Sequence, residues 1–126
     1  MYKLGPRSQM RLKGVHPDLV KVVERAIEVT TVDFTVLEGL RDPARQKVLV
    51  DSGASQTLNS RHITGHAVDL GAWVDNQVDW SWPLYSQIAK AMKTASQELG
   101  IPIEWGGDWK SFKDGPHFQL PRKAYP

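Results

Sequence analysis

Two of the four histidines and one aspartate of this chain could together bind a metal ion. His62 and Asp69 lie in the glycine-interrupted stretch 60–70, and His117 lies near the C-terminus. Zinc takes imidazole nitrogen and carboxylate oxygen, and a catalytic zinc site has three protein ligands and one position left open for water. We therefore interpret His62, Asp69 and His117 as the ligands of one zinc ion. From residue types alone, the alternative of surface side chains or a hydrogen-bonded histidine-aspartate pair stays open.

The stretch that holds the first two ligands is expected to be a turn that leads into a strand. His62 and His66 are four residues apart, like the histidines of the helical zinc signature that flank a glutamate. The glycine between them and the β-prone range 67–72 argue against a helix. Alternation along a strand turns Asp69 away from its two apolar neighbours, which are expected in the core. His66 is left outside the predicted ligand set.

The motif around these residues resembles that of a known family. It reads Ser-x-His-x-x-Gly-x-Ala-x-Asp from Ser60, then Trp-Gly-Gly-Asp-Trp at 105–109, Phe112, and Asp-x-x-His-Phe from Asp114. This specific three-part pattern is similar to that of the M15 zinc peptidases, which include D-Ala-D-Ala carboxypeptidases and phage L-alanyl-D-glutamate endopeptidases. The likeness covers nearly the whole chain.

The resemblance implies catalytic roles for two further residues. Asp114 matches the family's catalytic base, three residues before the last histidine ligand, although many relatives carry glutamate there. From the residues alone, Asp114 could equally belong to an Asp-Gly turn. Arg41, in a Gly-x-Arg context, matches an arginine beside the zinc that could stabilise an oxyanion. The alternative for Arg41 is an ordinary solvated arginine.

Weaker candidates surround this set. The resemblance places Gln46 near the arginine, and Ser60 opens the histidine motif. Asp108 is expected either to orient a ligand histidine as a hydrogen-bond acceptor or only to support the Trp-Gly-Gly turn. His16 is expected to be structural, because nothing near it forms a second ligand.

Periodicity and cap residues predict the order of the elements. The expected elements are an extended lead, a helix opened by His16-Pro17-Asp18, a strand at 33–40, and a helix from Pro43 to Gly53 that is capped by Asp42 and has Ala44, Val48 and Leu49 on its apolar side. These are followed by a loop at 52–60, the strand after residue 67, a hairpin-like excursion at 73–82, a helix at 83–99, and short strands at 101–105 and 116–120. This order predicts an α+β fold in which helices pack on a small, mainly antiparallel sheet that presents the zinc site. The resemblance to the M15 peptidases implies the hedgehog and D-Ala-D-Ala peptidase-like form of this fold.

Length and composition limit the other possibilities. The 126 residues suit one domain, so we expect 1–126 to be a single catalytic peptidase domain. The absence of cysteine excludes a disulfide framework and a thiolate zinc cluster. The net charge of +2 favours approach to an anionic polymer. The lysines and arginines are scattered without a nucleic-acid-binding motif, so nucleic acid is not an expected partner.

The resemblance implies a zinc-dependent endopeptidase that cleaves the L-Ala-D-Glu bond of the peptidoglycan stem peptide and acts as a monomeric phage endolysin. The N-terminal residues lack the apolar run of a signal peptide, and no segment reads as a membrane span. We therefore expect synthesis in the host cytoplasm, release by a separate holin-type protein, and action in the periplasm. The alternatives are a D-Ala-D-Ala carboxypeptidase or dipeptidase, or a non-catalytic zinc-stabilised binding module. The last is disfavoured by Asp114 and Arg41, because a structural site is closed and needs no base.

Overall fold

The computed structural model of the chain describes residues 1–54 and 60–126. Its helices are α1 (Pro6–Arg11), α2 (Pro17–Val29), α3 (Pro43–Asp51) and α4 (Trp82–Leu99), with a 3-10 turn, η1 (Gly106–Asp108). Its strands are β1 (Phe34–Glu38), β2 (Ala67–Val74), β3 (Gln77–Asp79), β4 (Glu104–Trp105) and β5 (His117–Gln119). The loop predicted at 52–60 falls largely on residues 55–59, outside the described residues.

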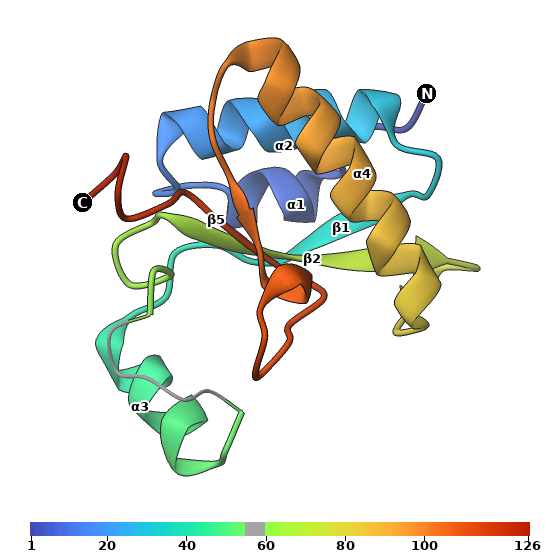
Figure 1. Cartoon of the computed structure of the whole chain (residues 1–126). Helices are drawn as coiled ribbons and strands as arrows, with labels where there is room; N and C mark the ends of the chain where they lie inside the picture. Colours follow the sequence, from blue (N-terminus) through green and yellow to red (C-terminus); the bar gives the residue numbers. More distant parts are fainter. Residues whose placement is uncertain (55–59) are drawn as a thin grey trace.

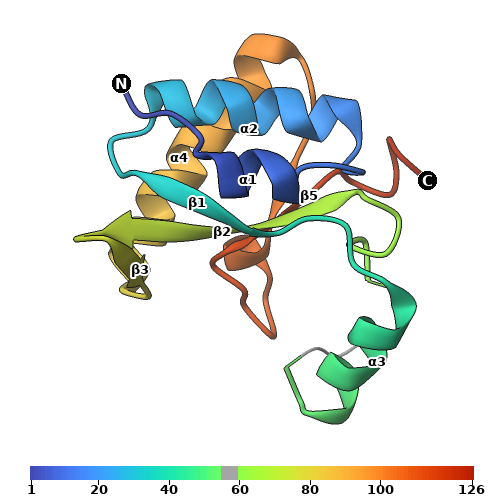
Figure 2. The same ribbon diagram turned by 180° about the vertical axis from the view of Figure 1, so that it is seen from behind.

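The strands form an antiparallel sheet whose two faces are covered differently. The strand order is β1-β2-β5-β4, and β3 pairs with the other end of β2 from β5. Helices α1, α2 and α4 lie against one face, whereas η1 and α3 lie toward the opposite side (Figures 1 and 2). The predicted α+β fold, with helices packed on a small antiparallel sheet, is confirmed.

The helix-covered face of the sheet builds the core. Alternation along β2 directs Val68, Leu70 and Ala72 into the core and leaves Asp69 on the other face. The apolar stripes of α2 and α4 pack against this face, as their periodicity predicts. Leu99, predicted to belong to the stripe of α4, is 42% exposed because it lies in the last turn of the helix.

Helix α1 replaces the extended lead expected at the N-terminus. Pro6 occupies its first turn, where the missing backbone donor is tolerated. Ser8 Oγ accepts the Val36 N–H at 2.9 Å, and Arg11 donates to the Val36 carbonyl at 3.0 Å. A helix of six residues is too short to show a hydrophobic period, so the contacts with β1 determine its structure.

Helix α3 begins where predicted, but its predicted apolar side is wrong. Asp42 accepts the Arg45 N–H at 2.8 Å and caps the helix. Ala44 and Val48 are exposed, and the buried side chain of α3 is the polar Gln46. The helix stands apart from the layered body in Figure 1. Its attachment to the rest of the protein therefore depends on a hydrogen-bonded side chain rather than on an apolar stripe.

The hairpin predicted after the central strand is present between β2 and β3. Its turn residues, Asp75 and Asn76, have φ values of 53° and 64°. Two consecutive residues with positive φ are what a tight two-residue hairpin requires, and asparagine and aspartate tolerate this conformation best after glycine.

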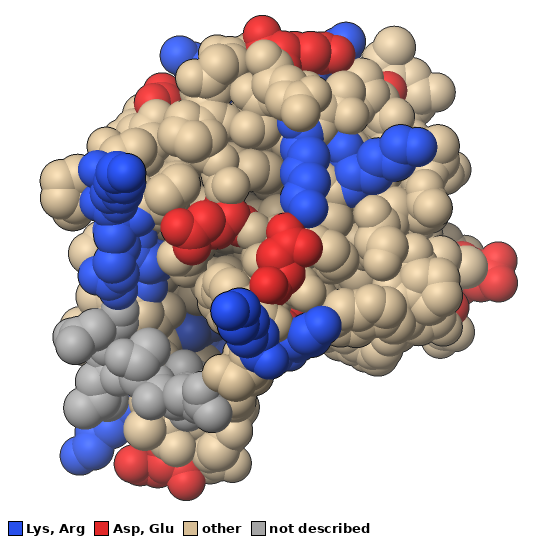
Figure 3. Space-filling model, in the orientation of Figure 1, with Lys and Arg blue, Asp and Glu red and all other residues tan. Residues whose placement is uncertain are grey.

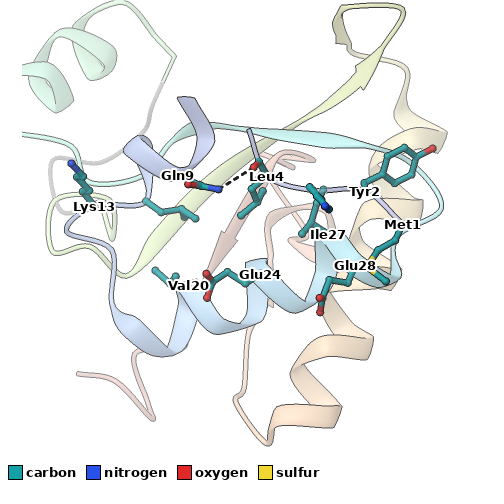
Figure 4. Close-up of a pocket in the computed structure, with 11 residues that line it drawn as sticks. Met1, Tyr2, Leu4, Gln9, Lys13, Val20, Glu24, Ile27 and Glu28 are labelled. Carbon is teal, nitrogen blue, oxygen red and sulfur yellow. Dashed lines mark hydrogen bonds between the residues drawn. The ribbon is translucent and has the colours of Figure 1, made fainter. Parts of the chain in front are cut away.

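A cavity lies on the helical side of the molecule. It measures about 620 Å³ and lies between the N-terminal segment and α2, where Leu4, Val20 and Ile27 line it (Figure 4). None of the predicted site residues contributes to this lining.

Acidic and basic side chains lie close together over the face shown in Figure 3. Within residues 1–54 and 60–126, no helix has the length and hydrophobicity to span a membrane.

Candidate active site

The register of the sheet aligns three ionisable side chains across neighbouring strands. Asp69 of β2 pairs with Glu38 of β1 on one side and with His117 of β5 on the other. The register of β1 against β2 shifts between Val36 and Glu38, and such a bulge re-aims the side chains that follow it. Because directly paired residues share a face, Glu38, Asp69 and His117 lie together on the face that the helices leave open.

His62 reaches the same place from the turn that precedes β2. Gly65 has a φ of 78°, and a side chain there would collide with the Gly14 carbonyl, so this turn requires glycine. The His16 N–H donates to the Gly65 carbonyl at 2.8 Å, and the Arg41 N–H donates to the His62 carbonyl at 2.9 Å. These bonds fix the turn to the start of α2 and to the segment after β1.

The side chains of His62, Asp69 and His117 converge. Asp69 Oδ1 lies 3.2 Å from His62 Nε2 and 3.3 Å from His117 Nδ1. One ligand atom from each residue lies within 4.8 Å of the other two. Both histidines are buried and Asp69 is half-buried. The structure thus brings together the three residues that the sequence singled out as ligands.

The outer nitrogens of both histidines face oxygen acceptors. His62 Nδ1 lies 2.8 Å from the Gly39 carbonyl, and His117 Nε2 lies 2.8 Å from Gln119 Oε1. The inner nitrogens, His62 Nε2 and His117 Nδ1, face Asp69. A proton on each outer nitrogen, shared with its acceptor, leaves the inner nitrogen free to bind a cation. Two ring nitrogens and a carboxylate oxygen at one point require a cation or protons between them. This donor set fits a metal ion of the zinc type.

The charges of this group support the same interpretation. Burial alone would raise the pKa of Asp69, but hydrogen bonds and charge from His117 and His62 hold it well below its ordinary value. Burial alone would lower the pKa of His117, but its contact with Asp69 raises it above the ordinary value. Asp69 is thus held as an anion, which is the form that binds a metal ion.

Arg41 lies beside Asp69 and is held in place by other polar side chains. Its Nη2 lies 3.4 Å from Asp69 Oδ2, and its Nε and Nη2 donate to Glu38. Its Nη1 donates to Gln46 Oε1 at 2.6 Å, and Arg45 donates to the second Glu38 oxygen at 2.9 Å. Burial would raise the pKa of Glu38, but hydrogen bonds from Arg41 and Arg45 lower it. The guanidinium is therefore fixed at the site with Glu38 ionised beneath it.

Asp114 occupies a tight bend at the side of the histidines. Its N–H donates to the Gly106 carbonyl at 3.0 Å, and its own carbonyl accepts the His117 N–H at 3.2 Å. A side chain on Gly106 would collide with the Asp114 carbonyl, so the Trp-Gly-Gly segment must lack one there. Burial raises the pKa of Asp114, and the Asp69 charge raises it further, against the lowering effect of the nearby histidines and arginine. A carboxyl group with a raised pKa is suited to proton transfer.

These groups line a cleft of about 690 Å³, a size typical of ligand-binding clefts. Ser60 is part of the lining, and its Oγ accepts the His62 N–H at 3.2 Å. Trp109 and Phe112 form an aromatic part of the wall, and the Trp109 ring packs on His117 with centroids 5.1 Å apart. The predicted site residues apart from Asp108 and Gln46 therefore border one open space, and Gln46 supports Arg41 from behind it.

Asp108 is the predicted site residue that the structure places elsewhere. It is exposed and accepts a hydrogen bond from Lys93 at 2.9 Å. The ring nitrogens of the two ligand histidines contact other groups, and the structure therefore contradicts the orienting role considered for Asp108. Its place at the end of η1 agrees with the alternative, in which it belongs to the turn.

The two other histidines lie outside the converging group, as predicted. His16 Nδ1 accepts the Asp18 N–H at 3.0 Å and caps α2. His66 Nδ1 lies 2.7 Å from Thr64 Oγ1, and the His66 ring packs 5.4 Å from that of His16. Burial lowers the pKa of His66, with Arg61 adding to the effect.

Sequence reasoning missed Glu38 and Gln119. Glu38 holds Arg41, and this contact could not be read from β1 alone, because the register of β1 against β2 shifts just before Glu38. Gln119 contacts His117, and its position two residues later on a strand places both on one face. The contact of Gln119 with His117 was the one that strand periodicity could have indicated.

Comparisons with known proteins agree with this geometry. The family model described as phage L-alanyl-D-glutamate peptidase matches residues 1–120. The L-alanyl-D-glutamate peptidase of Escherichia phage T5 is 34% identical to this chain over 128 residues, covering 98% of this chain and 93% of the relative. The crystal structure of Serratia marcescens L-Ala D-Glu endopeptidase ChiX superposes with a TM-score of 0.92 at 55% identity, covering 96% of this chain and 91% of that one. The vancomycin resistance D,D-dipeptidase VanXYg, at 18% identity and a TM-score of 0.57 over 84% of this chain and 50% of that one, shares the fold.

Proposed function

Because the chain belongs to the phage L-alanyl-D-glutamate peptidase family, we propose that it is a zinc-dependent endopeptidase that cleaves the L-Ala-D-Glu bond of the peptidoglycan stem peptide. The observation that carries this proposal is the convergence of His62, Asp69 and His117 at a cleft that Asp114 and Arg41 also line. A closed structural metal site would have no need of a cleft, a base or an arginine beside the ligands.

His62 Nε2, Asp69 Oδ1 and His117 Nδ1 would hold the ion. A zinc ion bound there would lower the pKa of a water molecule and polarise the scissile carbonyl. The Gly39 carbonyl behind His62 would keep Nε2 of that ring available for the ion. Ionised Asp69 would balance part of the charge of the zinc ion.

Asp114 serves as the general base in this proposal. Its carboxylate takes a proton from the attacking water and returns it to the leaving amine of D-Glu, which splits the peptide bond without a covalent enzyme intermediate. The raised pKa makes the carboxylate a better proton acceptor than an exposed aspartate. Aspartate is shorter than glutamate, and the tight bend before His117 brings its carboxyl group to the cleft.

Arg41 stabilises the negative charge that develops on the carbonyl oxygen. Its side chain is buried and permanently charged, so it needs little reorganisation during the reaction. Glu38 accepts hydrogen bonds from its Nε and Nη2, and Gln46 accepts one from its Nη1. Nη2 also lies next to Asp69. Ser60, in the wall of the same cleft, is available to contact the peptide.

The biological role that fits this activity is that of a phage endolysin. We propose that residues 1–126 act as one catalytic domain and as a monomer, made in the host cytoplasm and brought to the periplasmic cell wall by a separate holin-type protein. The relation to phage peptidases and the net charge of +2, which favours encounter with an anionic wall polymer, support this role.

The metal assignment is tested by substituting single histidines. His62→Ala and His117→Ala should each lose stoichiometric zinc after dialysis and should lose peptidoglycan hydrolysis, because each removes one of three ligands. His66→Ala is the matched control and should keep both. Zinc content is measured by atomic absorption, and folding by circular dichroism. Full zinc retention in both ligand variants, or a folded His66→Ala protein without zinc, would refute the assignment.

A further inference from the structure

On β5, the polar residue Gln119 contacts His117, one of the three proposed metal ligands. His117 and Gln119 are two residues apart on β5, so their side chains leave the same face of the sheet. Gln119 Oε1 lies 2.8 Å from His117 Nε2, the ring nitrogen that points away from Asp69. Neither the proposed peptidase chemistry nor the resemblance to the family assigns Gln119 a role.

The orientation of the Gln119 amide is set from the neighbouring strand. Glu104 of β4 is the register partner of Gln119, and Gln119 Nε2 donates to Glu104 Oε2 at 3.3 Å. A carboxylate accepts hydrogen bonds and does not donate them, so it attracts the NH₂ end of the amide. The oxygen end is thereby left toward His117. The reverse orientation would place the amide oxygen against the carboxylate and the NH₂ group against a ring N–H.

We propose that Gln119, oriented by Glu104, is a positioning residue that selects Nδ1 of His117 as the metal-binding nitrogen. The amide oxygen accepts the Nε2–H, which keeps the proton on the outer nitrogen and leaves the lone pair of Nδ1 facing Asp69. This inference rests on the proposed metal site. The inference adds Gln119 to that site. Glu104, Gln119 and His117 then form a hydrogen-bonded relay from the edge strand β4 to the metal ligands.

The two ligand histidines differ in how they are held. His62 presents Nε2, and its Nδ1 is held by the backbone carbonyl of Gly39, which a substitution of Gly39 would not remove. His117 presents the opposite nitrogen, Nδ1, and depends on a side chain for its outer partner. The affinity of the site for metal is therefore open to adjustment at Gln119, where a side chain holds the outer nitrogen.

A purely structural role is the competing explanation, because Gln119 also joins the short strands β4 and β5. In that case its loss would lower the melting temperature of the metal-free protein and leave zinc affinity alone. The positioning role predicts the opposite pattern, since the strand pairing itself uses backbone hydrogen bonds that remain in a side-chain variant.

The test measures zinc affinity of the metal-free protein by competition with a chromophoric chelator. Gln119→Leu should bind zinc about 10- to 100-fold more weakly than wild type, the range usual for loss of a ligand's outer partner. Gln77→Leu, the same substitution at an exposed position on β3, is the matched control and should bind as wild type does. Combining Gln119→Glu with Glu104→Gln exchanges acceptor and donor, keeps an oxygen toward His117, and should restore most of the affinity.

A second readout follows the proton itself. In the zinc-loaded wild-type protein, the Nε2–H of His117 should give a slowly exchanging low-field proton signal, and Gln119→Leu should lose it. Wild-type affinity in a folded Gln119→Leu protein, or failure of the exchanged pair to recover affinity, would overturn the relay. If wild type itself binds no stoichiometric zinc, the proposed metal site fails instead, so the two failures are distinguishable.

Discussion

At the scale of single residues, the site is held together by opposite charges and contains one carboxyl group in an unfavourable place. Asp69 is stabilised as an anion by the histidines and by Arg41. Asp114 lies partly buried near that anion, and its pKa is raised for both reasons. A group placed where its charge is disfavoured is a sign of function, because folding alone does not require it.

Asp114→Asn should abolish most turnover while leaving the metal site intact. The amide cannot take a proton from water, and loss of a general base typically costs about 10²- to 10⁴-fold in rate. Zinc content should stay at the wild-type value, since Asp114 is not among the converging ligand atoms. Release of peptide fragments from purified peptidoglycan gives the rate, and a variant with more than about a tenth of wild-type activity would exclude Asp114 as the base.

The same substitution should stabilise the metal-free protein at neutral pH. A folded-state pKa raised above the unfolded value means that proton binding favours the native state. The favourable contribution of Asp114 is complete below its unfolded pKa of about 3.9 and is lost as pH rises through its folded pKa. Asp114→Asn should therefore melt higher than wild type at pH 7, by a margin that shrinks toward pH 4. Asp51→Asn, at an exposed position, is the control; an equal margin at both pH values would contradict the account.

The site was partly foreseeable at this scale. Ligand chemistry and the motif singled out His62, Asp69 and His117, which the fold brings together. Of the two roles considered for Asp108, the structure agrees with the one in the turn, and its side chain contacts Lys93; the sequence alone does not show which way a carboxylate beside this motif points. Glu38 was missed because its contact with Arg41 depends on a strand bulge that no local pattern announces.

At the scale of elements, helices with a strong apolar stripe were predictable together with their buried face, whereas α1 was not foreseen and the buried face of α3 was predicted wrongly. Helices α2 and α4 have a clear period and form the core layer over the sheet. Helix α1 is too short for a period, and α3 buries only Gln46. Helix α1 is fixed by hydrogen bonds to the distant strand β1, and α3 by polar contacts with residues 38–42 just before it; neither kind of contact leaves a hydrophobic repeat in the sequence.

Gln46→Ala should show that α3 serves the site through its buried amide. The substitution leaves the buried Arg41 Nη1 without the acceptor at 2.6 Å, and a hydrogen bond to a charged group contributes about 1.5–3 kcal/mol. The free energy of unfolding in urea should fall by that amount, and hydrolysis should fall because Arg41 is less well fixed. Lys47→Ala, on the exposed side of α3, is the matched control. Equal stability of the two variants would show that the amide is not needed.

At the scale of the whole molecule, the sheet divides stability from chemistry. One face packs against α1, α2 and α4, and the other carries the ligand group, Arg41 and the cleft (Figures 1 and 2). The chemistry therefore depends on strand register and on the connecting segments that carry Arg41, His62 and Asp114, whereas the apolar face stabilises the fold. The cavity beside α2 contains none of these groups, and the proposed activity makes no use of it.

The bond that the protein cuts can be identified by analysing digested sacculi. Purified Gram-negative sacculi are incubated with the zinc-loaded protein, the glycan is then released with a muramidase, and the fragments are identified by mass spectrometry and amino-terminal labelling. The account predicts new amino termini on D-Glu and muramic acid that retains L-Ala, with Asp114→Asn producing neither. Release of terminal D-Ala alone would identify a carboxypeptidase, and unchanged muropeptides with zinc bound would contradict catalysis altogether.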